Sequence, residues 1–302
     1  MEIKNCLPEF EKQIHPIKDT ELEMFQKLYN EKAAHMDLAK ILNFYGPAGT
    51  GKNQLLRDIY NRKKSLGKTV KNPPDGSNPA ETETPVMIHC NIRGGISSVI
   101  SEIVRQSSNE YDFAFPLTCI CLYILSRTGE EQEADHAFPL PELRTAARDL
   151  ETESEFQYLK QILDRVPIDQ NGYSYLYGQL LFDQNAPRSL QKLIETNATL
   201  TENLFTWFSS RLSDLSAFFT SFFVADMEEN LKGHTKPAVI LLDGINNYFA
   251  SGSSAIEQKN KEKWMCGITG LLTTMPKVFW VLISNRKLNW EKDCLPDWKD
   301  FR

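Results

Sequence analysis

One short glycine-rich segment constrains this chain more than any other part of its sequence. Residues 46–53 read Gly-Pro-Ala-Gly-Thr-Gly-Lys-Asn, which fits the pattern G-x-x-x-x-G-K. A short apolar run at 41–45 precedes the segment, and apolar residues at helical spacing follow it at 53–63. Glycines there let the backbone curl so that N–H groups point inward, and the following helix directs its positive end at the same point. The pattern predicts a phosphate-binding loop between a buried strand and a helix.

The positions of this loop have separate expected roles. Lys52 supplies a mobile positive charge for the outer phosphates of a nucleotide. A Ser or Thr hydroxyl normally follows the lysine and ligates Mg²⁺, whereas Asn53 offers a carbonyl oxygen on a longer side chain, so we expect altered metal binding. The expected nucleotide-binding residues are Gly46, Pro47, Ala48, Gly49, Thr50, Gly51, Lys52, Asn53 and Gln54. The alternative interpretation is a glycine-rich turn that happens to contain a lysine.

A second apolar run ends in an acid. Residues 238–243 read AVILLD, and an acid at the end of a buried strand holds Mg²⁺ directly or through water in phosphate-transferring enzymes. Many hydrolases carry another acid just beyond, which polarises the attacking water. Here Asn246 and Asn247 follow Asp243, and an amide cannot usefully accept a proton at neutral pH. Metal binding at Asp243 is therefore expected, and efficient hydrolysis is not.

A third apolar run, 278–284, is followed by Asn285 and Arg286. An arginine at the carboxyl edge of a parallel sheet, beside the loop, can contact a terminal phosphate through two parallel hydrogen bonds. Alternatively, Arg286 only ends a strand at the surface.

The three segments together resemble the STAND class of P-loop NTPases, the signal-transduction ATPases related to AAA+ and NACHT proteins. The likeness lies in NFYGPAGTGK, VILLDG and ISNR, and it is greatest to the NTPase domain of bacterial members that carry tetratricopeptide repeats. It implies ATP or ADP with Mg²⁺ as ligands, Lys52, Asp243 and Arg286 as catalytic residues, and Asn53 and Asp243 as metal ligands. It also implies that the segment around 19–22 contacts the adenine.

The resemblance further implies a regulatory switch in signalling or anti-phage defence, which opens on sensing a ligand and forms homo-oligomers. Such proteins continue into a winged-helix segment and helical repeats, so a chain that stops at Arg302 is expected to be a fragment. The asparagines favour slow or impaired ATP hydrolysis.

Two other functions stay open. A DNA-associated AAA+-like ATPase would use basic residues, and a few follow the loop: Arg57, Arg62, Lys63, Lys64 and Lys68. A solvated helix face explains them as well. A structural or oligomerisation module that uses no nucleotide is the other alternative.

The expected fold is α/β, a P-loop NTPase with a parallel β-sheet flanked by helices and a large helical insertion. We expect a single domain over 1–302, with an N-terminal helical segment (1–40), a Walker A half (41–110), the helical insertion (111–235) and a Walker B and sensor half (236–302). The periodicity predicts further elements: helices at 19–34, 156–166, 204–223 and 264–275, strands at 85–91 and 278–284, and a loop at 67–85.

Charge and composition exclude several classes. The net charge is −6, and the segment 130–165, with ten acidic and four basic residues, carries all of it. We interpret that segment as a solvated part of the insertion, and the charge argues against a nucleic-acid partner. No apolar stretch approaches the roughly 20 residues of a membrane span, and no signal peptide begins the chain. The six scattered cysteines suggest reduced core thiols in a cytoplasmic protein. His89 is expected to be a satisfied core residue.

Overall fold

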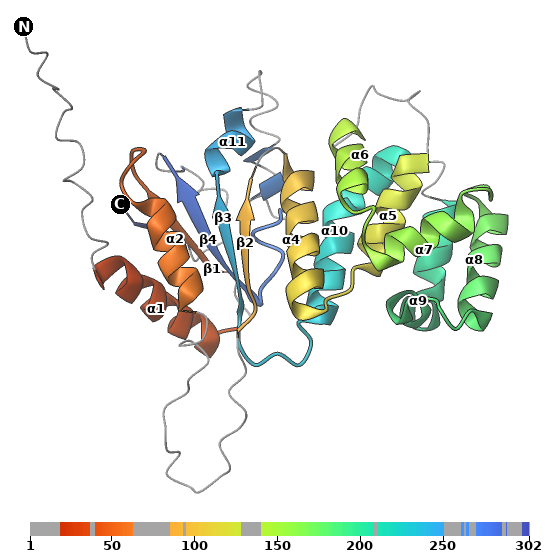
Figure 1. Cartoon of the computed structure of the whole chain (residues 1–302), viewed down its shortest axis with the longest axis horizontal. Coiled ribbons are helices and arrows are strands. Elements are labelled where there is room, and N and C mark those ends of the chain that lie inside the picture. Colours follow the sequence, from red (N-terminus) through yellow and green to blue (C-terminus); the bar gives the residue numbers. More distant parts are fainter. Residues whose placement is uncertain are drawn as a thin grey trace, which may run out of the picture.

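The core of the structure is a five-stranded sheet in which every pair of neighbouring strands is parallel (Figure 1). This computed structural model describes residues 19–36, 40–62, 85–92, 95–127, 140–207, 211–250, 261–262, 264–265, 270–285, 288 and 298–301. The strand order is β2 (Met87–Asn91), β3 (Ala238–Asp243), β4 (Val278–Ser284), β1 (Lys40–Tyr45) and β5 (Trp298–Phe301). The carboxyl ends of parallel strands meet at one edge, so the three segments singled out in the sequence end side by side.

Alternating residues of the strands build two hydrophobic cores. Helices α1 (Asp19–Ala34) and α2 (Lys52–Asn61) cover one face, where Phe25 stacks on Phe279 with ring centroids 5.7 Å apart. The opposite face packs Ile240 and Trp280 into a larger core that extends into the helical part of the chain. The central strands are apolar on both faces, as expected for a parallel sheet covered on both sides.

Side chains of α4 (Ile96–Tyr111) close the outer edge of β2. The Met87 N–H donates to the Tyr111 hydroxyl (2.7 Å), which donates back to the Met87 carbonyl (2.8 Å). Gln106 does the same at His89, accepting from its N–H (3.1 Å) and donating to its carbonyl (2.6 Å). These bonds satisfy the backbone groups that an open sheet edge would expose.

Replacing Tyr111 with phenylalanine keeps the ring but removes both bonds to Met87. We expect the free energy of unfolding to fall by about 1–2 kcal/mol, because a buried strand N–H and carbonyl lose their partner. Denaturant unfolding measures this change. Tyr175→Phe is the matched control, since that ring is 44% exposed, and it should leave stability unchanged. An equal loss in both variants would contradict the edge-closing role of Tyr111.

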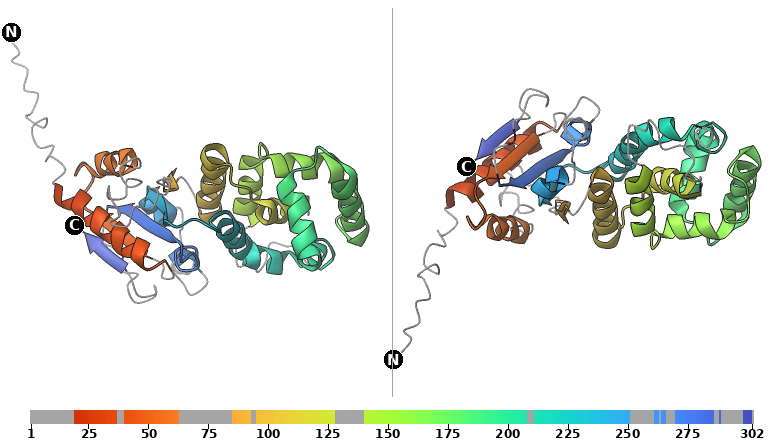
Figure 2. Two further views of the ribbon diagram at one scale, coloured as in Figure 1. Left: turned by 90° about the horizontal axis from the view of Figure 1, so that it is seen from below. Right: turned by 90° about the horizontal axis from the view of Figure 1, so that it is seen from above.

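A helical body follows α4 in the chain and lies on the far side of it from the sheet (Figure 2). Its helices are α5 (Pro116–Arg127), α6 (Leu140–Asp149), α7 (Ser154–Leu163), α8 (Gln170–Phe182), α9 (Arg188–Thr206) and α10 (Leu212–Asn230). Helix α10 leads back into β3. The two ends of the helical body are therefore tied to adjacent strands of the sheet.

Two polar residues of α10 hold the beginning of α5. Asp226 accepts from the Leu117 N–H (3.2 Å), the Thr118 N–H (2.8 Å) and the Thr118 hydroxyl (2.7 Å). Asn230 exchanges two hydrogen bonds with the backbone of Ala114 (2.7 and 3.1 Å). A carboxylate at a helix N-terminus satisfies donors that have no partner inside the helix. Asp226 thus caps α5 from a helix about a hundred residues further along the chain.

The structure corrects three details of the sequence prediction. The helix expected at 204–223 is two elements, because α9 ends at Thr206 and α10 begins at Leu212. Residues 270–275, predicted to end a helix, form turns. The acidic segment is not uniformly solvated: Glu155 is 6% exposed and accepts from the Ser189 hydroxyl (2.6 Å), and Glu142 and Glu153 are half-buried. Strand β5 was not predicted at all.

Other predictions are confirmed or lie outside the described residues. The helix at 19–34 and the strands at 85–91 and 278–284 are present, within two residues. Cys90, Cys119 and Cys121 are buried free thiols, and burial raises the pKa of each. The other three cysteines and most of the loop at 67–85 are not described. Within the described part of the chain, no helix combines the length and apolar character needed to cross a membrane.

Candidate functional site

The glycine-rich segment forms a tight loop between β1 and α2. Gly49 and Gly51 have φ angles of 84° and 83°, in the left-handed region that favours glycine, and nothing approaches either Cα where a side chain would stand. Gly51 is the N-cap of α2, so the helix begins at Lys52 and its positive end faces the loop. The Gly46 N–H donates to the Ser284 carbonyl (3.2 Å), which ties the loop to the end of β4.

The Lys52 side chain folds back over this loop. Its ammonium donates to the Gly46 and Pro47 carbonyls (2.7 Å each) and to the Thr50 hydroxyl (3.2 Å). The Thr50 hydroxyl in turn donates to the Pro47 carbonyl (3.0 Å). Burial lowers the pKa of Lys52, and the nearby negative charge of Asp243 opposes that effect. The loop lysine and the strand-end acid, 191 positions apart in the sequence, therefore share one electrostatic site.

Asp243 begins a tight turn. Its carboxylate accepts from the Gly244 N–H (2.7 Å), and its carbonyl accepts from the Ile92 N–H (2.8 Å), which joins the ends of β3 and β2. Gly244 has a φ of 75°, and a Cβ there would lie 2.8 Å from the Ile92 carbonyl. Any other residue at this position would combine backbone strain with a clash, so the turn requires glycine.

The two asparagines after this turn have structural partners. The Asn246 side-chain oxygen accepts from the Asn285 N–H (3.3 Å), and the Asn247 side-chain nitrogen donates to the Ile92 carbonyl (3.2 Å). Both residues belong to α11 (Ile245–Ala250), which follows the turn. Asn246 thus connects β3 to the end of β4, and Asn247 connects it to the end of β2. The amides hold the polar edge of the sheet together in the place where a hydrolase would carry acids.

Substituting each asparagine with aspartate separates these roles. Asn246→Asp keeps an acceptor for the Asn285 N–H, whereas Asn247→Asp sets a carboxylate against the Ile92 carbonyl and removes the donor. We expect Asn247→Asp to lower the free energy of unfolding by about 2 kcal/mol. Asn246→Asp should cost at least about 1 kcal/mol less, since its bond is retained. Thermal and denaturant unfolding measure both, and the reverse order would contradict the assigned partners.

A buried polar pair lies under the loop. Ser284, at the end of β4, donates to the side-chain oxygen of Asn43 in β1 (3.0 Å), and both residues are fully buried. A buried hydrogen bond between adjacent strands fixes the relative position of their carboxyl ends. Because β4 lies between β1 and β3, its end faces the space between the loop and Asp243. Asn285 is exposed there, and Arg286 lies outside the described residues.

The structure gives less support to the remaining predicted site residues. Asn53 is exposed on the first turn of α2, and Gln54 donates along the helix to Asp58 (2.9 Å) instead of toward the loop. Pro47 and Ala48 are exposed at the loop tip. Of the basic cluster, Arg57 and Arg62 belong to the described residues, and Lys63, Lys64 and Lys68 do not. Among the described residues, no group of three or more His, Cys, Asp or Glu side chains is placed to hold a metal ion.

The sequence predicts His89 to be a satisfied core residue, and the structure shows that this prediction is wrong. His89 is partly buried in β2 on the same face as Asp243, its ring lies near that of Tyr60 (6.5 Å), and within the described structure its Nε2 is buried without a hydrogen-bond partner. Burial lowers its pKa, and the charges of Asp243 and Glu102 raise it while that of Arg57 lowers it. The period-two pattern of the strand, which sets His89 and Asn91 on one face, was the signal available in the sequence.

Comparison of the whole chain with protein-family models, with curated proteins and with solved structures finds no match.

Proposed function

We propose that this chain is a P-loop NTPase module that binds ATP or ADP with Mg²⁺ at the 46–54 loop, and that it acts as a STAND-type regulatory switch in signalling or defence. The observation that carries the proposal is the joint geometry of the loop, α2 and Asp243. Two glycines with positive φ curl the loop, the helix N-terminus faces it, and Lys52 lies within the field of Asp243. A glycine-rich turn that happened to contain a lysine would have no reason to combine these three features.

The chemical groups of the loop and of Asp243 are suited to binding phosphate and Mg²⁺. A phosphate would receive backbone N–H groups of the loop and the positive end of α2, and it would offer Lys52 a charged partner instead of the neutral carbonyls of Gly46 and Pro47. Bound Mg²⁺ would neutralise phosphate charge, and Asp243 is the acid available to hold it. Asn53 offers a carbonyl oxygen on a longer side chain than Ser or Thr, and because Mg²⁺ requires strict octahedral geometry, this difference in length supports weaker metal binding.

The partners of Asn246 and Asn247 support slow hydrolysis. Both amides are engaged in bonds that hold the sheet edge, and neither can take a proton from water at neutral pH. We therefore propose that the chain signals through which nucleotide is bound, and that it does not hydrolyse ATP rapidly.

Steady-state turnover of Mg·ATP tests this part of the proposal. We expect a kcat at least a hundredfold below the roughly 10 s⁻¹ typical of enzymes, because Asn246 and Asn247, just beyond Asp243, cannot act as general bases. A phosphate-release assay on the purified chain, with Lys52→Ala as the blank for contaminating ATPase, measures it. A kcat near 10 s⁻¹ that vanishes in Lys52→Ala would contradict the switch and favour an active motor. Stimulation of that activity by DNA would identify a DNA-associated ATPase.

A further inference from the structure

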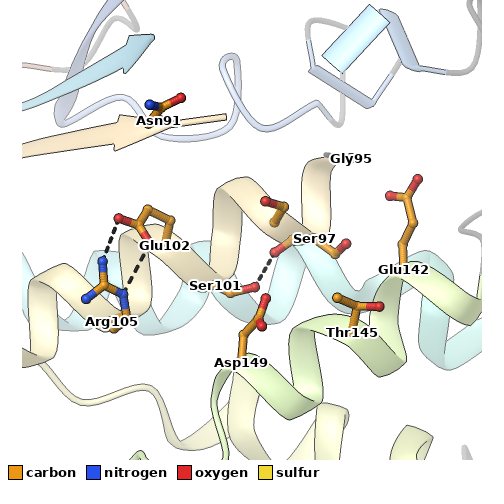
Figure 3. Close-up of a pocket in the computed structure, with 10 residues that line it drawn as sticks. Asn91, Gly95, Ser97, Ser101, Glu102, Arg105, Glu142, Thr145 and Asp149 are labelled. Atoms are coloured by element: carbon orange, nitrogen blue, oxygen red, sulfur yellow. Dashed lines mark hydrogen bonds and ion pairs between the residues drawn. The ribbon is translucent and has the colours of Figure 1, made fainter. Parts of the chain in front are cut away.

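The helical body faces the sheet on one side and ends at α8 on the other. On the sheet side, α6 packs against α4 around a polar pocket in which Arg105 pairs with Glu102 (2.7 Å) (Figure 3). At the far end, α8 is the outermost of the described helices in Figure 1 and in both views of Figure 2. Its main neighbours in the described structure are α9 and α7. The part of the chain that the structure describes leaves the outer face of α8 uncovered.

An uncharged stripe, rich in apolar side chains, follows this outer face. Phe182 is 85% exposed, Leu181 is 51% exposed and Tyr175 is 44% exposed, whereas the inner face of the helix buries Leu176 and Leu180. Positions that repeat every three or four residues share one face of a helix. The members of this α8 stripe are Asn171, Ser174, Tyr175, Gly178, Leu181 and Phe182. A helix that is apolar on both faces is typically covered on both, so we expect the stripe to contact a partner.

The charge of the stripe indicates which partner. None of the 13 residues of α8 is charged, although 25% of the chain is. In a two-fold symmetric dimer the same patch of each copy meets itself, so a patch with a net charge would repel its own copy. An uncharged patch avoids that repulsion, in a chain whose net charge is −6. An acidic or basic partner would find no opposite charge to pair with on α8. The stripe therefore fits a second copy of this chain.

We propose that the chain forms a two-fold symmetric homodimer through the α8 stripe, with the two α8 helices antiparallel and crossing at Gly178. Gly178 stands three residues after Tyr175 and four before Phe182, so both rings lie about 5 Å along the helix axis from the crossing point. An antiparallel crossing there sets Tyr175 of each copy against Phe182 of the partner subunit. Aromatic anchors of this kind carry much of the energy of an interface.

Gly178 supports this crossing point independently. Glycine disfavours a helix interior, and a Cβ at Gly178 would meet no described atom within 4 Å, so no packing inside the described chain requires a glycine there. Between two helices, the missing side chain lets the backbones approach closely. A pair of single helices buries less area than the roughly 1,600 Å² of a standard interface, so we expect a weak dimer with a dissociation constant on the order of 10 µM. This dimer does not depend on the function proposed for the 46–54 loop.

Sedimentation equilibrium of the nucleotide-free chain, from about 1 to 200 µM, tests the proposal. We expect a monomer–dimer equilibrium. Phe182→Lys and Tyr175→Glu should each weaken the dimer at least about tenfold, because each buries an unpaired charge. Their combination in one chain should dimerise at least about fivefold more tightly than either single variant, because the antiparallel register sets the new carboxylate against the new ammonium of the partner subunit.

Gly178→Gln separates the dimer from the fold of the monomer. The longer uncharged side chain should weaken the dimer at least about tenfold by holding the helices apart. The melting temperature at about 1 µM, where the chain is monomeric, should stay the same or rise, since glutamine favours a helix more than glycine does.

Phe218→Lys is the matched control, because it makes the same substitution at an exposed phenylalanine of α10, outside the α8 stripe. Its dissociation constant should stay within about twofold of that of the wild type. The proposal is overturned if the wild-type chain stays monomeric at the highest concentration, or if Phe218→Lys weakens the dimer as much as Phe182→Lys does. It is also overturned if Gly178→Gln dimerises like the wild type, or if the double variant dimerises no better than either single variant.

Discussion

Replacement of Lys52 by alanine should weaken the binding of Mg·ATP by at least about a hundredfold, because a charge-assisted contact to phosphate in a partly buried site contributes about 3 kcal/mol. The lysine holds its ammonium over the loop, 2.7 Å from each of two loop carbonyls, so its charge is already in place for a phosphate. The alanine variant should keep its fold, since the two left-handed glycines, not the lysine, set the curl of the loop.

Lys192→Ala is the matched control for this prediction. That lysine forms a surface ion pair with Glu229 on α10 (2.7 Å) and is 63% exposed. Its removal also lowers the charge by one but should leave nucleotide affinity unchanged. Fluorescent-nucleotide titration compares the three proteins, and equal affinity in wild type and Lys52→Ala would show that the loop is not the nucleotide site.

Asp226→Ala should produce the largest loss of stability, about 3 kcal/mol or more in the free energy of unfolding. Its carboxylate is fully buried and accepts three hydrogen bonds at the start of α5, so truncation leaves three buried donors without a partner. Asp226→Asn should cost less, because one side-chain oxygen remains to accept. Asp214→Ala is the control: its surface pair with Arg211 (3.6 Å) contributes at most about 0.5–1 kcal/mol. A similar loss in the two alanine variants would contradict the capping role.

The same carboxylate predicts a pH dependence. Burial raises the pKa of Asp226 from 3.8 to about 7, against the lowering effect of the bonds from Thr118 and Leu117. Since the unfolded chain ionises first as pH rises, this group favours folding most below pH 3.8, and its contribution is lost progressively up to about pH 7. The stability of the wild type relative to Asp226→Asn should therefore fall between those values and level off above them. A flat difference in denaturant unfolding across this range would contradict the raised pKa.

The loop and the acid strand were predictable because local physics determines them. A local sequence pattern marks each of three features: glycines with positive φ, an apolar strand of five or six residues, and the start of a helix. Gly49, Gly51 and Asp243 lie where these patterns predict. The partners of Asn246 and Asn247 were not predictable, because both bonds reach residues of other strands, and the sequence gives no register between them. The same reason explains why the cap at Asp226 and the buried Glu155 were missed: their partners lie 108 and 34 positions away.

In the helical body, some helix boundaries are marked in the sequence and others are not. Its elements are bounded by residues that serve turns and caps, such as Asp169, whose carboxylate accepts from the Asn171 and Gly172 N–H groups at the start of α8. Local capping of this kind is readable in principle. The break between α9 and α10 is not, because the aromatic residues on both sides continue an apolar pattern across it.

Calorimetric titration of Mg·ATP and Mg·ADP into the wild-type chain tests the central claim most directly. We predict binding of one nucleotide per chain, with the affinity lost in Lys52→Ala and kept in Lys192→Ala. Absence of heat and of any nucleotide-dependent rise in thermal stability, in a chain shown to be folded, would contradict it and leave a structural module that uses no nucleotide.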